Sequence, residues 1–225
     1  FTFAMLLKEV EKIKGLERIR FMTPHPKDFS DDLLEVMEHS EKICNHIHFP
    51  LQSGSSKILK IMNRKYTKEQ YLDWVQKIRE KLPDVSLTTD IIVGFPGETE
   101  DDFKDTLDVI QKAKFDSAYT FIYSKRTGTP AASMEGQVPE SIVKDRFNRL
   151  LETVGCVSHE VHARYTGQTV KVLVECINSQ DSSLVTGRLT NNMLVHFPGD
   201  ASLIGKIIKV KLAESKGFYY IGCME

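Results

Sequence analysis

The sequence lacks the cysteine spacing of a metal-binding domain. Its four cysteines, at positions 44, 156, 176 and 223, are widely scattered. They form neither a CxxC pair nor a CxxxCxxC group, the spacings that hold zinc and iron–sulfur clusters. Because free cysteine is among the residues most often buried, we expect reduced thiols in a cytoplasmic protein, several of them in the core. The sequence therefore predicts no metal site built by this chain alone.

Long apolar runs and a strong charge of one sign are also missing. No run approaches the roughly 20 residues that a membrane-spanning helix requires, and no signal peptide is visible. Lys and Arg number 30 against 31 Asp and Glu, a net charge of −1. This balance argues against a strongly basic protein that coats DNA, although it leaves a local RNA-binding patch open. We expect a cytoplasmic protein without a membrane partner.

Familiar hydrolase patterns are absent too. His25, His46 and His48 form no HExxH or other close ligand pattern. No strained serine turn of the α/β-hydrolase kind is present. The three histidines are therefore expected to be structural or exposed to solvent, and no catalytic residue is predicted.

Helical and strand patterns alternate over residues 1–162. An amphipathic helix opens the chain and is expected to end at Gly15, and strands are expected at 19–23, 46–51, 85–93 and 117–123. Ser30, Thr67 and Thr99 precede helical patterns as N-caps. Strands separated by helices predict parallel βαβ units. Four strands cannot close a barrel, so we expect an α/β fold with an incomplete parallel (β/α) barrel. Since the chain opens inside a helical pattern without Met, we also expect a fragment that begins within a domain.

The pattern changes after a long predicted helix that begins near Pro139. Short β-rich runs follow at 168–176, 183–190, 194–197, 204–213 and 217–222, with turns between them. Five short strands in about 60 residues are typical of a small antiparallel barrel of the OB or SH3-like kind. We therefore divide the chain into domains at 1–162 and 163–225.

Polar and glycine-rich segments follow the strands of the first domain, where parallel sheets collect their ligands. Gln52 and Asp90 are suited to hydrogen-bond a sugar, and Arg64 to clamp a carboxylate. The glycines of residues 94–99 allow a ligand close to the backbone, and the amides of the following helix favour an anion. From spacing alone, an ordinary turn with a helix cap explains residues 94–99 equally well.

Three segments of the first domain resemble the radical-SAM methylthiotransferases: HFPLQSGSSKILKIMNRKYT at 48–67, TTDIIVGFPGETEDDF at 88–103 and FIYSKRTGTPAASM at 121–134. Two later segments, TGQTVKVLVE at 166–175 and TGRLTNNMLVHFPGD at 186–200, resemble the TRAM domain that closes those enzymes. The resemblance covers essentially the whole chain. Within the family, the sequence is most similar to the branch that modifies N6-isopentenyladenosine in tRNA.

The resemblance implies a radical reaction that adds a 2-methylthio group to N6-isopentenyladenosine next to the anticodon. In the family, a 4Fe-4S cluster held by a CxxxCxxC loop cleaves S-adenosylmethionine (SAM), and a second cluster supplies sulfur. The resemblance assigns SAM binding to Gln52, Ser53, Arg64, Asp90, Gly94, Gly97 and Glu98. Because the CxxxCxxC loop and the sulfur-donor domain are missing here, we expect half a SAM site and no radical activity from this chain alone.

The resemblance also implies that the small β-barrel binds the anticodon stem-loop of tRNA. The basic candidates are Lys171, Arg188, Lys206, Lys209 and Lys211, with Lys216 beside them. Phe197, Phe218 and Tyr219 are candidates for stacking on bases, although strand alternation places at least half of them in the core. The alternative for the lysines is an ordinary solvated face.

Other interpretations stay open. The parent enzyme would instead modify threonylcarbamoyladenosine in tRNA or a ribosomal protein, or the chain would be a non-catalytic RNA-binding module. We also expect the first strand, at 19–23, to leave an open sheet edge through which two copies pair.

Overall fold

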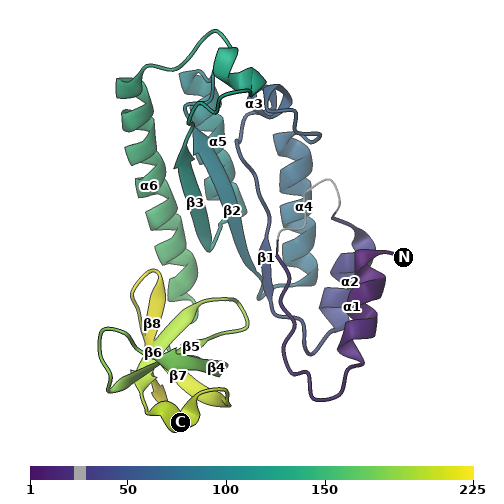
Figure 1. Cartoon of the computed structure of the whole chain (residues 1–225), viewed down its shortest axis with the longest axis vertical. Coiled ribbons are helices and arrows are strands. Elements are labelled where there is room, and N and C mark those ends of the chain that lie inside the picture. The colour runs from purple at the N-terminus through teal and green to yellow at the C-terminus, as the bar shows by residue number, and fades with distance from the viewer. Residues whose placement is uncertain (23–28) are drawn as a thin grey trace.

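The first part of the molecule is a three-stranded sheet with helices packed on it (Figure 1). The computed structural model describes residues 1–22 and 29–225, so His25 and the expected end of the first strand lie outside the described residues. In chain order the elements are α1 (Phe3–Glu11), α2 (Asp31–His39), β1 (His46–His48), α3 (Ser56–Ile61), α4 (Lys68–Lys81), β2 (Ser86–Val93), α5 (Glu100–Ala113), β3 (Ser117–Ile122), η1 (Pro130–Ser133) and α6 (Glu140–Ala163).

The sheet is parallel throughout, with β2 between β1 and β3. Alternate residues of β2 point to opposite faces. Leu87, Ile91 and Val93 are buried in the core with the apolar residues of α4 and α5, while Thr88 and Asp90 point to the other face. Among the described elements, no helix crosses that second face of β2 and β3 (Figure 1). The sheet is therefore the predicted incomplete parallel (β/α) barrel, with one face open.

The predicted helix caps are confirmed. The hydroxyl of Ser30 accepts a hydrogen bond from the Leu33 amide at the start of α2. Thr67 forms a reciprocal capping box with the third residue of α4, and Thr99 does the same with Asp102 at the start of α5. Each cap satisfies an amide that the helix itself leaves unpaired.

Two predictions near the start of the chain were wrong. Helix α1 ends at Glu11, before Gly15, and it buries Ala4 and Leu7. The strand expected at 19–23 is reduced, over the described residues 19–22, to a single parallel bridge between Ile19 and Ile43. The side chains on either side of Ile19 are arginines that bind the β-barrel, so this segment follows the barrel surface rather than the sheet.

The second part is a closed five-stranded barrel in the order β4 (Thr169–Ile177), β5 (Leu184–Arg188), β6 (Leu194–Pro198), β8 (Tyr219–Met224) and β7 (Ile207–Ser215), with η2 (Ala201–Leu203) between β6 and β7. Four of the pairings are antiparallel, as predicted, and the β6–β8 pairing is parallel. The barrel has its own core, which includes Val172, Phe197 and Leu212. Closure leaves the small barrel without a free edge.

Two arginines from the first part hold the barrel in place. The Arg18 guanidinium donates to the carbonyls of Arg188 at 2.7 Å and Lys171 at 3.0 Å. The Arg20 guanidinium donates to the carbonyl of Leu189 at 2.6 Å and the side chain of Asn192 at 3.2 Å. These bonds connect residues about 170 positions apart, which no periodicity in the sequence could reveal.

Other contacts between the two parts lie at the amino ends of the strands. The Tyr165 hydroxyl donates to the carbonyl of Asp84, just before β2, at 3.4 Å. Arg164 lies 3.8 Å from the buried carboxylate of Asp116, just before β3. At the end of α6, the Tyr220 hydroxyl donates to the His162 carbonyl at 2.9 Å. The barrel therefore sits at the amino-terminal edge of the sheet.

Replacing both arginines, R18Q/R20Q, should loosen this junction without unfolding the barrel core. Each guanidinium contributes roughly 1 kcal/mol through its hydrogen bonds to carbonyls, so the loss of both should raise amide hydrogen exchange over residues 188–192 about thirtyfold. The exposed Lys14, changed to Gln, is the matched control in the same segment. Unchanged exchange in R18Q/R20Q would show that the barrel is held by other contacts.

Candidate functional site

Gln52 and Asp90 meet at the carboxyl-terminal edge of the sheet. The Gln52 amide donates to the Asp90 carbonyl at 2.7 Å, and the Ile92 amide donates to the Gln52 carbonyl at 2.9 Å. Gln52 has φ of 70°, a left-handed conformation that is uncommon outside glycine. Hydrogen bonds on both sides fix this conformation, so the structure brings together the two residues predicted to bind a sugar.

A row of polar side chains leads along the open face to Asp90. The Thr88 hydroxyl lies 2.9 Å from His46 Nε2 and 3.0 Å from His48 Nδ1. His48 Nε2 lies 3.3 Å from Asp90 Oδ2. Both histidines are buried, so the prediction of a structural role fits their surroundings. The alternation of HIH at 46–48 with TTD at 88–90 was the sequence signal for this row, and sequence reasoning missed it.

The turn after β2 is fixed to α6. Gly94 has φ of +79°, and a β-carbon there would meet Val143 at 2.7 Å. The Glu98 carboxylate accepts hydrogen bonds from the Gly94 amide at 3.0 Å and from Arg146 at 2.8 Å. Burial raises the pKa of Glu98, and the Gly94 amide and Arg146 oppose that shift. Glu98 and Gly94 therefore shape the turn, whose Gly97 amide in turn donates to the carbonyl of Gly136 at 2.8 Å.

The turn after β1 is packed against α5. Ser53 is fully buried, and its hydroxyl accepts a hydrogen bond from the Ser55 amide at 3.2 Å. The Gly54 amide donates to Thr106 at 2.9 Å, and a β-carbon at Gly54 would overlap the α5 backbone at 2.4 Å. Ser53 therefore stabilises the turn that follows Gln52.

Arg64 lies after α3, close to the residues that precede Gln52. Its amide donates to the Leu59 carbonyl at 2.8 Å. The neighbouring Tyr66 hydroxyl donates to the carbonyls of Pro50 and Leu51 at 3.1 and 3.2 Å. Burial raises the pKa of Tyr66 to about 12, and the charge of Arg64 opposes that rise.

The predicted basic residues of the barrel divide into two groups. Lys171 on β4 is paired in register with Lys209 on β7, and Lys211 lies two residues further on β7. These lysines and Lys206 are exposed, with no acidic partner within 4 Å in the described chain. Arg188 instead donates to Glu175 at 2.7 Å. The lysines of β4 and β7 thus form a cationic face, which also carries the Glu225 carboxylate, bonded to the Thr169 hydroxyl at 3.0 Å.

Most of the remaining residues predicted to bind RNA already have contacts within the barrel. Lys216 is paired with Glu214 at 2.6 Å. Phe197 is fully buried in the barrel core and cannot stack on a base, whereas Phe218 is 78% exposed. Tyr219 packs against the ring of His196 with centroids 4.7 Å apart. Of the three aromatic candidates, Phe218 alone presents most of its ring to solvent.

Residues 1–22 and 29–225 hold no group of three or more His, Cys, Asp and Glu side chains that could bind a metal ion. Cys44 is buried and the other three cysteines are exposed and unpaired. The residues present therefore do not fit an iron–sulfur cluster. None of the described helices is both long and apolar enough to cross a membrane.

The buried His46 predicts how the free energy of unfolding depends on pH. Burial lowers the pKa of His46 to about 4, and the charge of Arg20 acts in the same direction. An unfolded histidine has a pKa near 6.5, so between these values the unfolded chain binds a proton that the folded chain does not. The free energy of unfolding should therefore fall as the pH is lowered from about 6.5 to 4, by about 3 kcal/mol from this residue.

Urea denaturation at pH 7 and pH 4.5 checks this prediction. H46Q should lose less stability than the wild type over this interval, because it has no imidazole to protonate. H159Q, which changes an exposed histidine of α6, should behave as the wild type. An equal loss in H46Q and wild type would mean that His46 does not carry the effect.

The comparisons with known families and curated proteins agree with this geometry. Residues 2–110 match the Radical SAM superfamily and residues 163–223 match the TRAM domain. The chain is 62% identical, over 99% of its length, to the tRNA-2-methylthio-N(6)-dimethylallyladenosine synthase of Lachnoclostridium phytofermentans. It is 58% identical, over 94% of its length, to the synthase of the same name from Acetivibrio thermocellus. It covers 49% and 44% of those proteins, about half of their length.

Solved structures show a similar fold. Coproporphyrinogen III oxidase (HemN) from Escherichia coli, described as a radical SAM enzyme, aligns with 96% of this chain and 54% of its own at a TM-score of 0.54. The two sequences are 16% identical, so the likeness concerns the fold alone. Taken together, the two domain matches and the near-full-length similarity to the synthases show that the chain belongs to the radical SAM superfamily and carries a TRAM domain.

Proposed function

We propose that the chain is the SAM-holding and RNA-holding part of a tRNA methylthiotransferase. The enzyme would add a 2-methylthio group to N6-isopentenyladenosine, also called N6-dimethylallyladenosine, next to the anticodon. The observation that carries the proposal is 62% identity to such a synthase over 99% of this chain. Because the chain spans about half of that relative, the activity of the whole enzyme is inferred. A cytoplasmic location, where tRNA is found, is part of the same proposal.

We infer that Asp90 and Gln52 bind the ribose of SAM and that Arg64 binds its carboxylate. Two features support this. Asp90 Oδ2 is occupied by His48, which leaves Oδ1 available to accept from a hydroxyl. Arg64 lies two residues before Tyr66, whose hydroxyl binds the Pro50 and Leu51 carbonyls, and a guanidinium matches a carboxylate with two parallel bonds. When bound, SAM supplies an organic radical and a methyl group.

The other SAM candidates would shape the site. Ser53 supports the turn behind Gln52, and the buried Glu98 fixes the turn that begins at Gly94. Gly97 has φ of +81° and nothing within 4 Å of an added β-carbon, which leaves room for an adenine beside the backbone. The described residues offer no cluster ligands, so the roles assigned to this chain are binding, orientation and exclusion of water.

His48 and Thr88 would act through Asp90. A buried histidine that bonds Thr88 on one side and Asp90 on the other restricts the rotation of that carboxylate. A carboxylate held in advance loses less conformational freedom when it binds a hydroxyl. We therefore assign His48 as a positioning residue for the proposed ribose contact.

We infer that the barrel binds the tRNA anticodon arm through the cationic face of β4 and β7. Lys171, Lys209 and Lys211 stand on adjacent strands without acidic partners in the described chain, a pattern suited to successive phosphates. The exposed Phe218 is available to stack on an unpaired base. Pairing of two copies through the edge of β1 is a further part of the proposal, since β1 has β2 on one side only.

The SAM assignment predicts a loss of affinity in D90N. Replacing the carboxylate with an amide removes charge-assisted hydrogen bonds to the ribose while keeping the side-chain shape, so the Kd for SAM should rise about tenfold. Titration calorimetry on the chain measures it, with D101N on the exposed start of α5 as the control. A Kd unchanged in D90N would remove Asp90 from the site.

The RNA assignment predicts salt-sensitive binding that prefers the isopentenyl base. The test is titration of an isopentenylated anticodon stem-loop into the chain at two salt concentrations, beside a threonylcarbamoylated stem-loop. K171Q/K209Q/K211Q should lower the slope of log Kd against log salt by about 2, since each phosphate contact contributes roughly 0.7 to 0.9.

The control for this titration changes three lysines that already have acidic partners, K104Q/K112Q/K144Q. It should leave the slope nearly unchanged. Equal affinity for the two modified loops would contradict selection of the isopentenyl group by this chain. An unchanged slope in the barrel variant would place the RNA elsewhere.

A further inference from the structure

Two aromatic rings stand on the open face of β3 without a cover. Tyr119 is 54% exposed and Phe121 is 51% exposed. They are two residues apart on a strand, so both rings project from the same face of the sheet. Large exposed aromatic side chains that lie side by side mark a binding surface more often than singly scattered ones do.

These rings lie beside the residues proposed to hold SAM. In the parallel register, Asp90 is paired with Tyr119 and Ile92 with Phe121. The edge of the Tyr119 ring meets the His48 ring, with centroids 5.7 Å apart. The aromatic pair therefore continues the polar row of the open face, one strand further from β1.

Two unpaired cations follow the rings in the chain. Lys125 and Arg126 are exposed, and neither has an ion-pair partner among the described residues. Most other exposed lysines of α4, α5 and α6 do have one, for example Lys112 with Asp108 at 2.7 Å. An uncompensated pair of charges next to exposed rings favours an anionic partner with flat groups.

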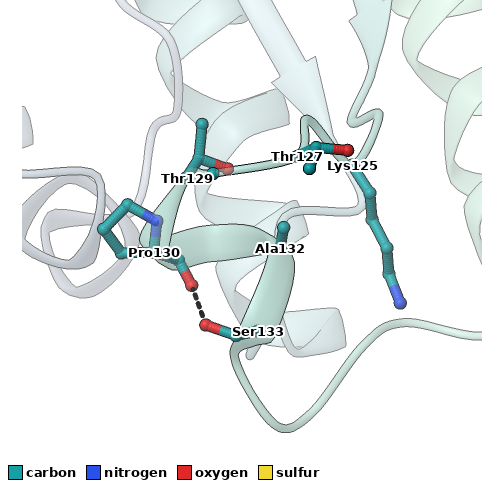
Figure 2. A pocket seen from close by; sticks show the side chains of 7 residues that line it. Lys125, Thr127, Thr129, Pro130, Ala132 and Ser133 are labelled. Atoms are coloured by element: carbon teal, nitrogen blue, oxygen red, sulfur yellow. Dashed lines mark hydrogen bonds between the residues drawn. The ribbon is translucent and has the colours of Figure 1, made fainter.

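The loop that carries the cations has a defined shape. The Thr129 hydroxyl donates to the Arg126 carbonyl at 2.8 Å, and the Gln137 side chain donates to the carbonyls of Ala131 and Met134. An open hollow of about 650 Å³ is lined by Lys125, by residues 127–130, and by Ala132 and Ser133. Figure 2 shows the Lys125 side chain extending along one side of this loop, with Pro130 on the other side. The loop follows the carboxyl end of β3 and leads into η1.

Single-stranded RNA carries both kinds of group that these residues can bind, flat bases and phosphates. Base–aromatic stacking uses the faces of exposed rings, and phosphates pair with cations that have no other partner. We propose that an unpaired stretch of RNA lies on this face, with a base against Tyr119 or Phe121 and its phosphates on Lys125 and Arg126. The inference rests on the proposed tRNA substrate and names a second RNA contact, on the sheet rather than on the barrel.

The test measures binding of a fluorescently labelled RNA stem-loop with an anticodon-arm sequence to the 225-residue chain. Y119L/F121L keeps apolar volume but removes the stacking rings and should raise Kd about tenfold. K125Q/R126Q should lower the slope of log Kd against log salt by about 1.4, from two phosphate contacts at roughly 0.7 each.

Matched controls lie close by. T120A changes the neighbouring residue, which alternation points away from the rings, and K14Q removes an exposed charge from the segment after α1. Neither should change the Kd by more than about twofold. Because Tyr119 and Phe121 are half exposed, thermal melts of Y119L/F121L should match the wild type. Ultraviolet crosslinking of the wild-type complex, mapped by mass spectrometry, should label residues 115–126 and gives an answer even if a variant fails to fold.

The outcomes separate this inference from the proposed function. If the RNA binds and K171Q/K209Q/K211Q weakens it while the β3 variants do not, the inference is wrong and RNA binding by the barrel stands. If the wild-type chain binds no RNA, both fail. If Y119L/F121L instead changes the mass measured by light scattering, this face joins two copies of the chain, and the inference is overturned.

Discussion

The central position of β2 is the constraint on which the rest of the structure depends. Its backbone pairs with β1 and β3 at once, and its two rows of side chains serve different environments. Leu87, Ile91 and Val93 enter the helix-covered core. Thr88 and Asp90 supply the polar row of the open face. A shift of one residue in this register would exchange the two rows, burying a carboxylate and exposing the core.

Charges taken out of water are compensated by specific partners on each side of the sheet. Glu98 and Arg146, both almost fully buried, satisfy each other and the amide of Gly94. The guanidinium groups of Arg18 and Arg20 donate hydrogen bonds to backbone carbonyls of the barrel. The buried Glu98–Arg146 pair contributes little net free energy but makes alternatives costly, since separating it leaves a buried charge unpaired. This pair accounts for the defined position of the turn after β2, and the bonds of Arg18 and Arg20 account for that of the barrel.

Local patterns in the sequence were enough for most of the fold. Alternation of helices and strands predicted the incomplete parallel barrel, and the caps at Ser30, Thr67 and Thr99 were read correctly because capping depends on neighbours three residues away. The segment around Ile19 was misread because its partners are carbonyls about 170 positions distant. Phe197 looked available for RNA because alternation alone does not tell which face of a small barrel points inward.

The candidate site was predictable to the same extent. Gln52 stands out as a polar residue just after β1 and Asp90 as a carboxylate within the apolar strand β2, and parallel pairing brings the two segments together. The histidines were undervalued because their role appears only when His48 is seen between Thr88 and Asp90. Glu98 was assigned to a ligand, yet its partner Arg146 lies 48 positions away on a helix that the motif does not include.

Helix α6 separates the barrel from the carboxyl edge of the sheet. It runs beside the sheet from the carboxyl edge to the barrel at the amino edge (Figure 1). Its 24 residues span about 36 Å at 1.5 Å per residue. Under the proposed function, one tRNA would touch both the barrel and the loops at the carboxyl edge of the sheet. A free nucleoside is far too short for that, whereas a folded arm of nucleic acid can bridge the gap. The proposed substrate would therefore be selected by its length as well as by its base.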